Sequence, residues 1–256
     1  MIGLSKGLKK HFPAVFNAIT SCGEWQFCGT EDNIWVRDYM PVRTVFGPVQ
    51  FGYRKKIKAE IVLDGGNVVT TLGKVILTDI IFRQNRHLSK RWVASKLERA
   101  FQKQLVIIPV EPFDTLGHAD GIVHSITGNK LFVNDYSALC SKEYNAYSTR
   151  LIKILNKAGF DVNLIPNAYH KCPQMTERVF RRAYPMADDY NPAVGYYINY
   201  LVHGSIVLFP VFGFFEDEEV AVLLKKSYPS FILKPIPCFD LAMTGGLIHC
   251  VTYDTP

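Results

Sequence analysis

The 256-residue chain lacks a long run of basic residues, although its formal net charge is +6 and its isoelectric point is about 8.9. Its basic residues stand singly or in short groups such as Lys55-Lys56, Arg181-Arg182 and Lys225-Lys226. Proteins that bind nucleic acids usually carry a clustered basic stripe. The scattered charge therefore argues against a nucleic-acid partner.

The chain also lacks an apolar run long enough to cross a membrane. Its longest apolar stretch, near residues 206–215, contains Pro210 and Gly213 and is far shorter than the ~20 residues that a membrane-spanning helix needs. Residues 1–10 are polar and basic, and no apolar segment follows them. We therefore expect no membrane partner, no secretory signal and a cytoplasmic protein.

No two of the six cysteines form a C-x-x-C pair, and no pair of histidines and cysteines has the spacing of a zinc site. Without an export signal, cysteines in a chain of this length are typical of reduced thiols. The sequence thus predicts neither a disulfide framework nor a bound metal. The cysteines are Cys22, Cys28, Cys140, Cys172, Cys238 and Cys250.

The chain does contain a repeated alternation of strand-like and helix-like segments. The pattern predicts strand 75–77, helix 89–103 and strand 105–109; strand 130–133, helix 141–158 and strand 161–166; and strand 205–210, helix 216–227 and strand 231–235. A further helix is expected at 5–19, with further strands at 61–63, 122–126, 196–200 and 247–252. Because the unit recurs about every fifty residues without a linker, we expect one α/β domain over residues 1–256. Residues 181–192 are expected to form an irregular excursion over a site.

A candidate nucleophile, Cys250, ends the segment Gly245-Gly246-Leu247-Ile248-His249-Cys250. Two glycines at the end of an apolar strand allow a sharp turn that exposes the thiol. The alternative is a buried thiol, because cysteine is among the most buried residue types. On an extended segment His249 points to the opposite face, which favours a structural role for it.

A candidate proton carrier, His118, lies in the segment Gly117-His118-Ala119-Asp120. On a strand His118 and Asp120 share one face, and the flanking glycines leave room around them. The alternative is a surface turn.

Two further segments carry carboxylates. Asp38 follows Trp35, a flat wall for a planar cation, although Arg37 and Asp38 could instead form a surface ion pair of little energetic value. Asp64-Gly65-Gly66-Asn67 follows an apolar run, although Asp-Gly is also a strong hairpin signal. A thiol, an imidazole and carboxylates together suit covalent chemistry on a cationic planar carbon such as a guanidinium.

Five segments in this order resemble the agmatine deiminase family, which includes the bacterial (Porphyromonas-type) peptidylarginine deiminases. The resemblance runs from about residue 30 to the end of the chain. It implies the fold of the guanidino-group-modifying enzymes (penteins), a five-bladed α/β propeller of ββαβ repeats around a central site. Only four helices are clear, so we expect one blade to be trimmed or irregular. The segments are 35–41 (WVRDYMP), 64–67 (DGGN), 117–120 (GHAD), 199–200 (NY) before 207–210 (VLFP), and 245–252 (GGLIHCVT).

The resemblance also implies roles for particular residues. Cys250 becomes the nucleophile and His118 the general acid and base, while Asp38 and Asp120 bind the guanidinium. Trp35, Asp64 and Asn67 complete the expected substrate-binding set. Asp64 stands where the family has glutamate, one methylene longer. The implied reaction needs neither a metal nor an organic cofactor.

The expected reaction is hydrolytic deimination of a guanidine through a covalent thiouronium, with release of ammonia and a ureido product. A small agmatine-like molecule is favoured over peptidyl arginine. Three other readings stay open, namely an amidinotransferase with the same residues, another thiol hydrolase that needs no Asp38, and a guanidine-binding protein without turnover. The sequence leaves the oligomeric state undetermined.

Overall fold

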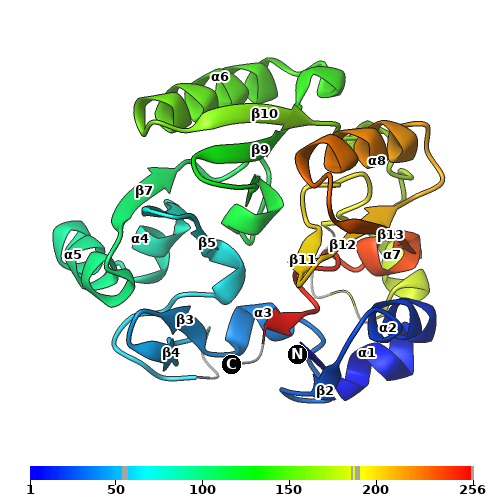
Figure 1. Cartoon of the computed structure of the whole chain (residues 1–256), viewed down its shortest axis with the longest axis horizontal. Coiled ribbons are helices and arrows are strands. Elements are labelled where there is room, and N and C mark those ends of the chain that lie inside the picture. Colours follow the sequence, from blue (N-terminus) through cyan, green and yellow to red (C-terminus); the bar gives the residue numbers. More distant parts are fainter. Residues whose placement is uncertain (54–56, 186, 188–190, 255–256) are drawn as a thin grey trace. The chain divides into compact units, whose positions relative to one another are not determined.

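The computed structural model describes residues 1–53, 57–185, 187 and 191–254. The chain divides into two compact units, and Figure 1 labels their helices and strands. Unit 1 comprises Met1–Val36, Asn134–Cys140 and the residues from Ile165 to the last described one, and unit 2 comprises Arg37–Val133 and Ser141–Leu164. The described residues form four three-stranded sheets and one two-stranded sheet. No helix among them is both long enough and apolar enough to span a membrane.

Unit 2 is built around the sheet β5-β6-β7, in which β6 pairs antiparallel with β5 and parallel with β7. The sheet β8-β9-β10 follows, with β8 antiparallel to β9, and the hairpin β3-β4 makes the two-stranded sheet. The strands are β3 (Val42–Thr44), β4 (Gly47–Val49), β5 (Val69–Thr70), β6 (Lys74–Thr78), β7 (Gln104–Ile108), β8 (Val123–Ser125), β9 (Lys130–Asn134) and β10 (Asp161–Ile165). The helices are α3 (Val36–Tyr39), α4 (Ile80–Gln84), α5 (Lys90–Phe101) and α6 (Lys142–Lys157), with 3-10 turns η1 (Gly65–Asn67) and η2 (Ala119–Gly121).

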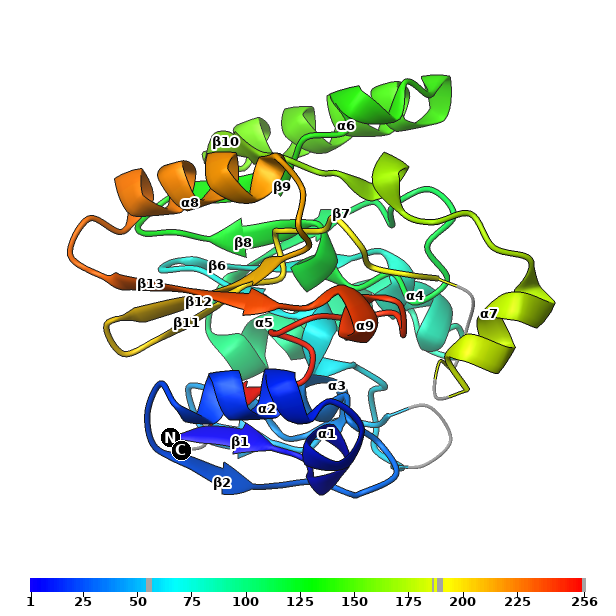
Figure 2. The ribbon, with the colours of Figure 1, turned by 90° about the vertical axis from the view of Figure 1, so that its right-hand side faces the viewer.

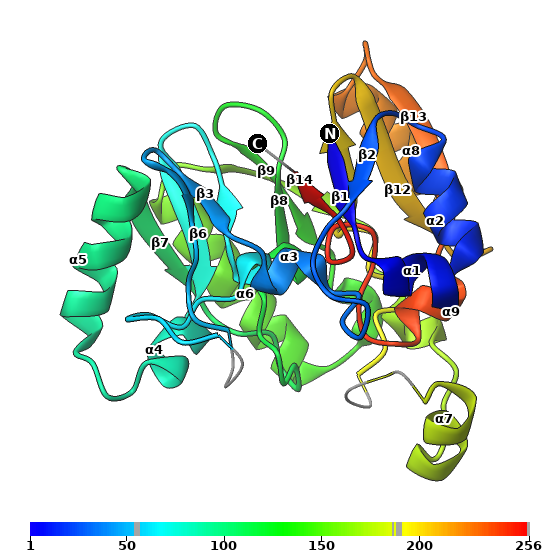
Figure 3. The same cartoon turned by 90° about the horizontal axis from the view of Figure 1, so that it is seen from below.

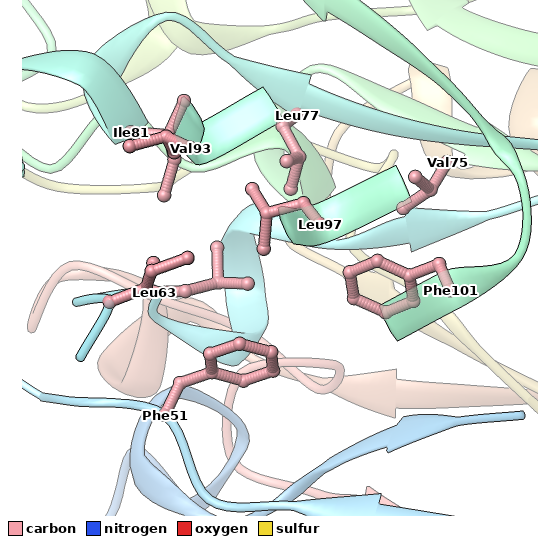
Figure 4. Packing of buried hydrophobic residues seen from close by; sticks show 9 residues of the cluster. Phe51, Leu63, Val75, Leu77, Ile81, Val93, Leu97 and Phe101 are labelled. Atoms are coloured by element: carbon pink, nitrogen blue, oxygen red, sulfur yellow. The ribbon is translucent and has the colours of Figure 1, made fainter. Parts of the chain in front are cut away.

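Helix α5 forms as its sequence predicts. The hydroxyl of Ser89 accepts the Trp92 backbone N–H at 3.2 Å and caps the helix. Val93, Leu97 and Phe101, spaced by four residues, make its buried face. They pack with alternate residues of β6 and with residues from the segment before η1, and Figure 3 shows α5 beside β7 and β6. The buried cluster comprises Phe51, Ile61, Leu63, Val75, Leu77, Ile81, Val93, Leu97 and Phe101 (Figure 4).

Unit 1 repeats the same pairing pattern in two sheets, β11-β12-β13 and β14-β1-β2, although β14 is the last strand of the chain. In each, the first pair of strands is antiparallel and the second is parallel. Figure 2 shows α8 running above β13 and α2 lying above β1. The strands are β1 (Ile2–Leu4), β2 (Trp25–Phe27), β11 (Leu201–His203), β12 (Ile206–Val211), β13 (Ile232–Pro237) and β14 (Tyr253–Asp254). The helices are α1 (Lys6–His11), α2 (Pro13–Thr20), α7 (Glu177–Ala183), α8 (Glu216–Ser227) and α9 (Phe239–Ala242), with 3-10 turns η3 (Ser137–Leu139) and η4 (Tyr169–Lys171).

Four local predictions were wrong. The helix expected at 5–19 is two helices, because Pro13 starts α2 and ends α1 at Phe12. Residues 61–63 form only an isolated bridge from Gly52 to Val62, and 196–200 only a bridge at Tyr196, with the strand β11 starting later. Residues 247–251 form a turn rather than a strand.

The segment 181–192 that we expected to be irregular begins inside helix α7, which continues to Ala183. Residues 186 and 188–190 of that segment lie outside the described part of the chain, as does the basic pair 55–56. The mixed α/β fold predicted from the alternation of segments is confirmed, and the three predicted strand-helix-strand units are present.

Candidate functional site

Unit 2 gathers three carboxylates around one imidazole, a group named here the acidic cluster (Asp38, Asp64, His118 and Asp120). The His118 Nδ1 lies 3.5 Å from Asp38 Oδ1, and its Nε2 lies 3.1 Å from Asp64 Oδ2. All four side chains are buried, with exposed fractions from 2% to 7%. Buried charges persist in proteins only when they are paired. The imidazolium therefore offsets part of the negative charge, and one further cation would offset more.

Gly66 is the residue that allows the cluster to close. A Cβ on Gly66 would lie 2.6 Å from Asp38 Oδ1, 2.8 Å from His118 Nδ1 and 3.4 Å from Asp120 Oδ1. The neighbouring Gly65 faces the carbonyl of Arg37, which would clash with any added Cβ. Both glycines are thus required because α3 approaches the η1 backbone closely.

The end of strand β6 ties the turns of the cluster together through Thr78. Its backbone N–H donates to Asn67 Oδ1 at 2.9 Å, and its hydroxyl donates to the carbonyl of Gly117. The amide of Asn67 is thereby oriented, and its Nδ2 is buried with no hydrogen-bond partner among the described residues. Asn67 therefore offers an unused donor next to Gly66.

The imidazole of His118 is strongly basic in this setting. Burial by itself lowers its pKa, but the negative charge of Asp38, the hydrogen bond to Asp64 and the charges of Asp64 and Asp120 outweigh burial and raise the pKa to about 10. His118 is thus an imidazolium at neutral pH and starts as a proton donor. Any bound cation would repel this proton and make it easier to lose.

The structure corrects the local geometry that we expected for the acidic cluster. His118 caps η2 and Asp120 lies within it, so the two are not alternate residues of a strand. Asp64 caps η1 and does not open a hairpin. Asp38 lies in α3 and is buried, which excludes an exposed ion pair with Arg37.

Unit 1 holds Cys250 in a turn that is organised by one amide. The Oδ1 of Asn199 accepts the backbone N–H of His249 at 3.1 Å and that of Cys250 at 3.3 Å, and it lies 3.4 Å from Cys250 Sγ. Asn199 is itself buried. A thiol that donates to an amide oxygen is held in its neutral form and in one orientation.

Glycine is needed at positions 245 and 246, just before this turn, for two different reasons. Gly245 has φ +103°, in the left-handed region that favours glycine. A Cβ on Gly246 would lie 2.5 Å from a ring carbon of Trp35, so the indole packs directly on its backbone. Trp35 therefore supports the turn that carries Cys250.

Cys250 differs from the buried cysteines of the chain. Cys172 and Cys238 are buried, and burial raises the pKa of each thiol, to about 11 for Cys172. Cys250 is half-buried, between the exposed and the fully buried alternatives that its sequence left open.

Among the described residues, no group of three or more His, Cys, Asp and Glu side chains could hold a metal ion.

Sequence reasoning missed two residues of these sites, Thr78 and Asn199. Thr78 is a polar residue at the end of the apolar run 75–77, a position that often faces a site at the carboxyl end of a strand. Asn199 belongs to a segment that carries the family resemblance, but nothing in the sequence placed its amide beside Cys250, 51 residues away.

Comparisons with known proteins agree with this architecture. Residues 48–256 match the family model described as Porphyromonas-type peptidyl-arginine deiminase. A protein from Marinomonas sp. (strain MWYL1) that is assigned to the agmatine deiminases is 25% identical over 218 residues, which cover 77% of this chain and 58% of that protein. The chain thus spans less than two thirds of that relative's length.

Two solved structures share the fold at low identity. The agmatine deiminase of Enterococcus faecalis is 17% identical with a TM-score of 0.75, and the likeness covers 98% of this chain and 92% of that one. The agmatine deiminase of C. jejuni is 18% identical with a TM-score of 0.69, and the likeness covers 93% and 77%.

These likenesses define a mixed α/β protein of the pentein fold. Because the family model matches most of its length, the chain belongs to the Porphyromonas-type peptidyl-arginine deiminase family. The family resemblance inferred from the order of the five motifs is thereby confirmed.

Proposed function

We propose that this protein hydrolyses a guanidinium group, releasing ammonia and a ureido product, with Cys250 as the nucleophile. The observation that carries the proposal is the buried imidazole of His118 between the carboxylates of Asp38 and Asp64. Three carboxylates and one imidazolium leave two net negative charges in a dry environment. Such a cluster favours a planar cation that can donate several hydrogen bonds at once.

In the first half-reaction, the Cys250 thiolate attacks the central carbon while Asp38 and Asp120 hold the guanidinium nitrogens. His118 protonates the departing nitrogen, which leaves as ammonia, and a covalent S-alkylthiouronium remains. The pKa of about 10 suits this step, because the imidazole carries its proton at neutral pH. The Cys250 thiol, which donates to Asn199, first gives its proton to solvent, and the proton that leaves with ammonia is the one from His118.

In the second half-reaction, His118 is neutral and takes a proton from water, which attacks the same carbon. The carbon–sulfur bond breaks, and the ureido product leaves with Cys250 restored as a thiolate. The guanidinium and the thiouronium both carry one positive charge, so the fixed carboxylates hold the substrate and the covalent intermediate in the same place. The proposal requires the thiol and the acidic cluster to act on one guanidinium. Asp64 contributes its buried Oδ1 as an acceptor for the guanidinium, and Asn67 completes the proposed substrate-binding set.

We further propose a small agmatine-like guanidine as the substrate, and no organic cofactor. The names of the relatives support agmatine over peptidyl arginine, whereas the family model's description supports the peptide. A cytoplasmic location is part of the proposal, supported by all six cysteines being thiols.

The fold proposal is a five-bladed propeller in one domain over residues 1–256. Support comes from three sheets in which the central strand has one antiparallel and one parallel neighbour, and the hairpin β3-β4 is the proposed trimmed blade. An experimental structure with five blades around one centre would bear this out, and separate domains would refute it.

The test is ammonia release from purified protein with agmatine, free arginine, a blocked arginine amide and an arginine peptide. We expect release from one guanidine, its loss in Cys250→Ala, and retention of guanidine binding by that variant in calorimetry. Full activity of Cys250→Ala would sink the assignment of the nucleophile.

Adding an amine acceptor separates hydrolysis from amidino transfer, since only a transferase would form a new guanidine. Activity retained in Asp38→Asn would favour another thiol hydrolase. Binding without ammonia release from any guanidine would identify a binding protein that lacks turnover.

A further inference from the structure

Gln84, the last residue of helix α4, reaches the acidic cluster through Asp64. Its Nε2 donates to Asp64 Oδ2 at 3.4 Å. The same oxygen lies 3.1 Å from His118 Nε2, while Asp64 Oδ1 is buried with no hydrogen-bond partner among the described residues. One carboxylate oxygen is therefore shared by the imidazole and by the amide.

The orientation of the Gln84 amide is set by this carboxylate. A carboxylate only accepts hydrogen bonds, so Nε2 must face it and the oxygen Oε1 must point away. Oε1 is buried and has no hydrogen-bond partner among the described residues. Among the described residues, the Gln84 side chain thus makes its hydrogen bond to Asp64.

A rigid frame holds Gln84 next to Asp64. The adjacent Asn85 accepts the Val62 backbone N–H on its Oδ1 at 2.9 Å and donates from Nδ2 to the Val62 carbonyl at 2.8 Å. It also donates to the Ile81 carbonyl within α4. The end of α4 and the segment leading to Asp64 are therefore clamped together. This pairing also explains why residues 61–63 are not a strand, since Asn85 occupies both backbone groups of Val62.

We infer that Gln84 is a positioning residue of the site, which acts through the Asp64 oxygen that it shares with His118. The inference rests on the proposed function, because it concerns how His118 exchanges protons. Gln84 adds a donor to the Asp64 oxygen that the imidazole also contacts. A donor on Oδ2 weakens the oxygen as an acceptor for the imidazole. Gln84 thereby helps His118 to release its proton and to act as a base.

The test replaces Gln84 by methionine, which has similar length and no amide, and by alanine. Gln104→Met is the matched control, because Gln104 is an exposed glutamine of β7 in the same unit. His118 is followed by NMR in histidine-labelled protein across pH, with a His118→Asn spectrum to assign its signal. Ammonia release from the active guanidine is measured over the same pH range.

Without the Gln84 amide, Asp64 Oδ2 accepts a hydrogen bond from the imidazole only. Both Gln84 variants should therefore raise the pKa of His118. We expect a rise of about half a unit, a matching shift of the acid limb of kcat to higher pH, and about threefold lower kcat at pH 7. KM should stay within about twofold, because Gln84 does not bind the guanidinium in this scheme. Gln104→Met should match the wild type.

An unchanged His118 titration in folded Gln84→Met and Gln84→Ala would overturn the inference, and so would a fall in the pKa. Both variants lack the donor but differ in side-chain size, so an effect seen in both is due to the lost hydrogen bond and not to a packing defect. The titration needs no turnover. If the wild type releases no ammonia, the proposed function fails while the role of Gln84 is still decided.

Discussion

Replacing Gly66 by alanine should disable the acidic cluster with a single methyl group. The added Cβ would lie 2.6 Å from Asp38 Oδ1 and 2.8 Å from His118 Nδ1, whereas ordinary contacts begin at 3.4 Å. Each group would have to retreat by more than half an ångström, and both are buried. Because the carboxylate and the imidazole hold each other, neither can rotate away without losing its charged partner.

The expected cost of this overpacking is about 1–3 kcal/mol of the free energy of unfolding. The expected effect on guanidine binding is larger than the loss of stability alone, because Asp38 is displaced from the position in which it clamps the cation. A shift of ~1 Å at such a group lowers the rate by up to about a hundredfold. We therefore expect near-complete loss of ammonia release in a protein that still folds.

The assay combines urea unfolding, calorimetric titration with the active guanidine and ammonia release. Gly73→Ala is the control, since nothing lies within 4 Å of a Cβ at that position. Gly73 is an exposed residue between β5 and β6. If Gly66→Ala matched Gly73→Ala in stability and in affinity, the close packing of the cluster around Gly66 would be refuted.

Two more predictions concern one unit each. Folding raises the pKa of His118 from about 6.5 to about 10, so its contribution to the free energy of unfolding is complete below pH 6.5 and is lost as pH rises through 10, with a slope of at most ~1.4 kcal/mol per pH unit. Urea unfolding from pH 6 to 10 should show this decline in the wild type but not in His118→Asn. Equal slopes in the two proteins would contradict the prediction. Asn199→Ala removes the acceptor of the Cys250 turn, so we expect at least a roughly tenfold lower kcat, equivalent to ~1.4 kcal/mol, and an altered rate of Cys250 alkylation. The control Asn17→Ala, on the exposed face of α2, should leave both rates unchanged. Wild-type kcat and alkylation in Asn199→Ala would show that the amide does not position the thiol.

Prediction from sequence succeeded where local signals agree with tertiary packing. The helix α5 has a serine cap, an apolar face at four-residue spacing and a buried parallel strand on each side of it in the chain. Each of these signals is short in range and reports burial directly. The same holds for α8, whose acidic first turn and basic last turn suit the helix dipole.

Prediction failed where apolar runs are buried without pairing as strands. Ile61 and Leu63 pack in the core of unit 2, yet the backbone of Val62 between them pairs with the side chain of Asn85. Leu247, Ile248 and Val251 are apolar and buried, but Asn199 and the glycines bend this segment into a turn. Hydrophobic patterning reports burial and cannot distinguish these partners from a neighbouring strand.

The sequence by itself determined the family, the α/β class and the residue types that the chemistry needs, because motif order and hydrophobic period are written along the chain. Only the tertiary structure decided that Asp38, Asp64 and Asp120 surround His118, that Gly66 must lack a side chain, and that the amides of Gln84 and Asn199 contact Asp64 and Cys250. The physical reason is that hydrogen bonds and charge pairs between distant segments depend on distances of a few ångströms, which packing sets and no local pattern encodes.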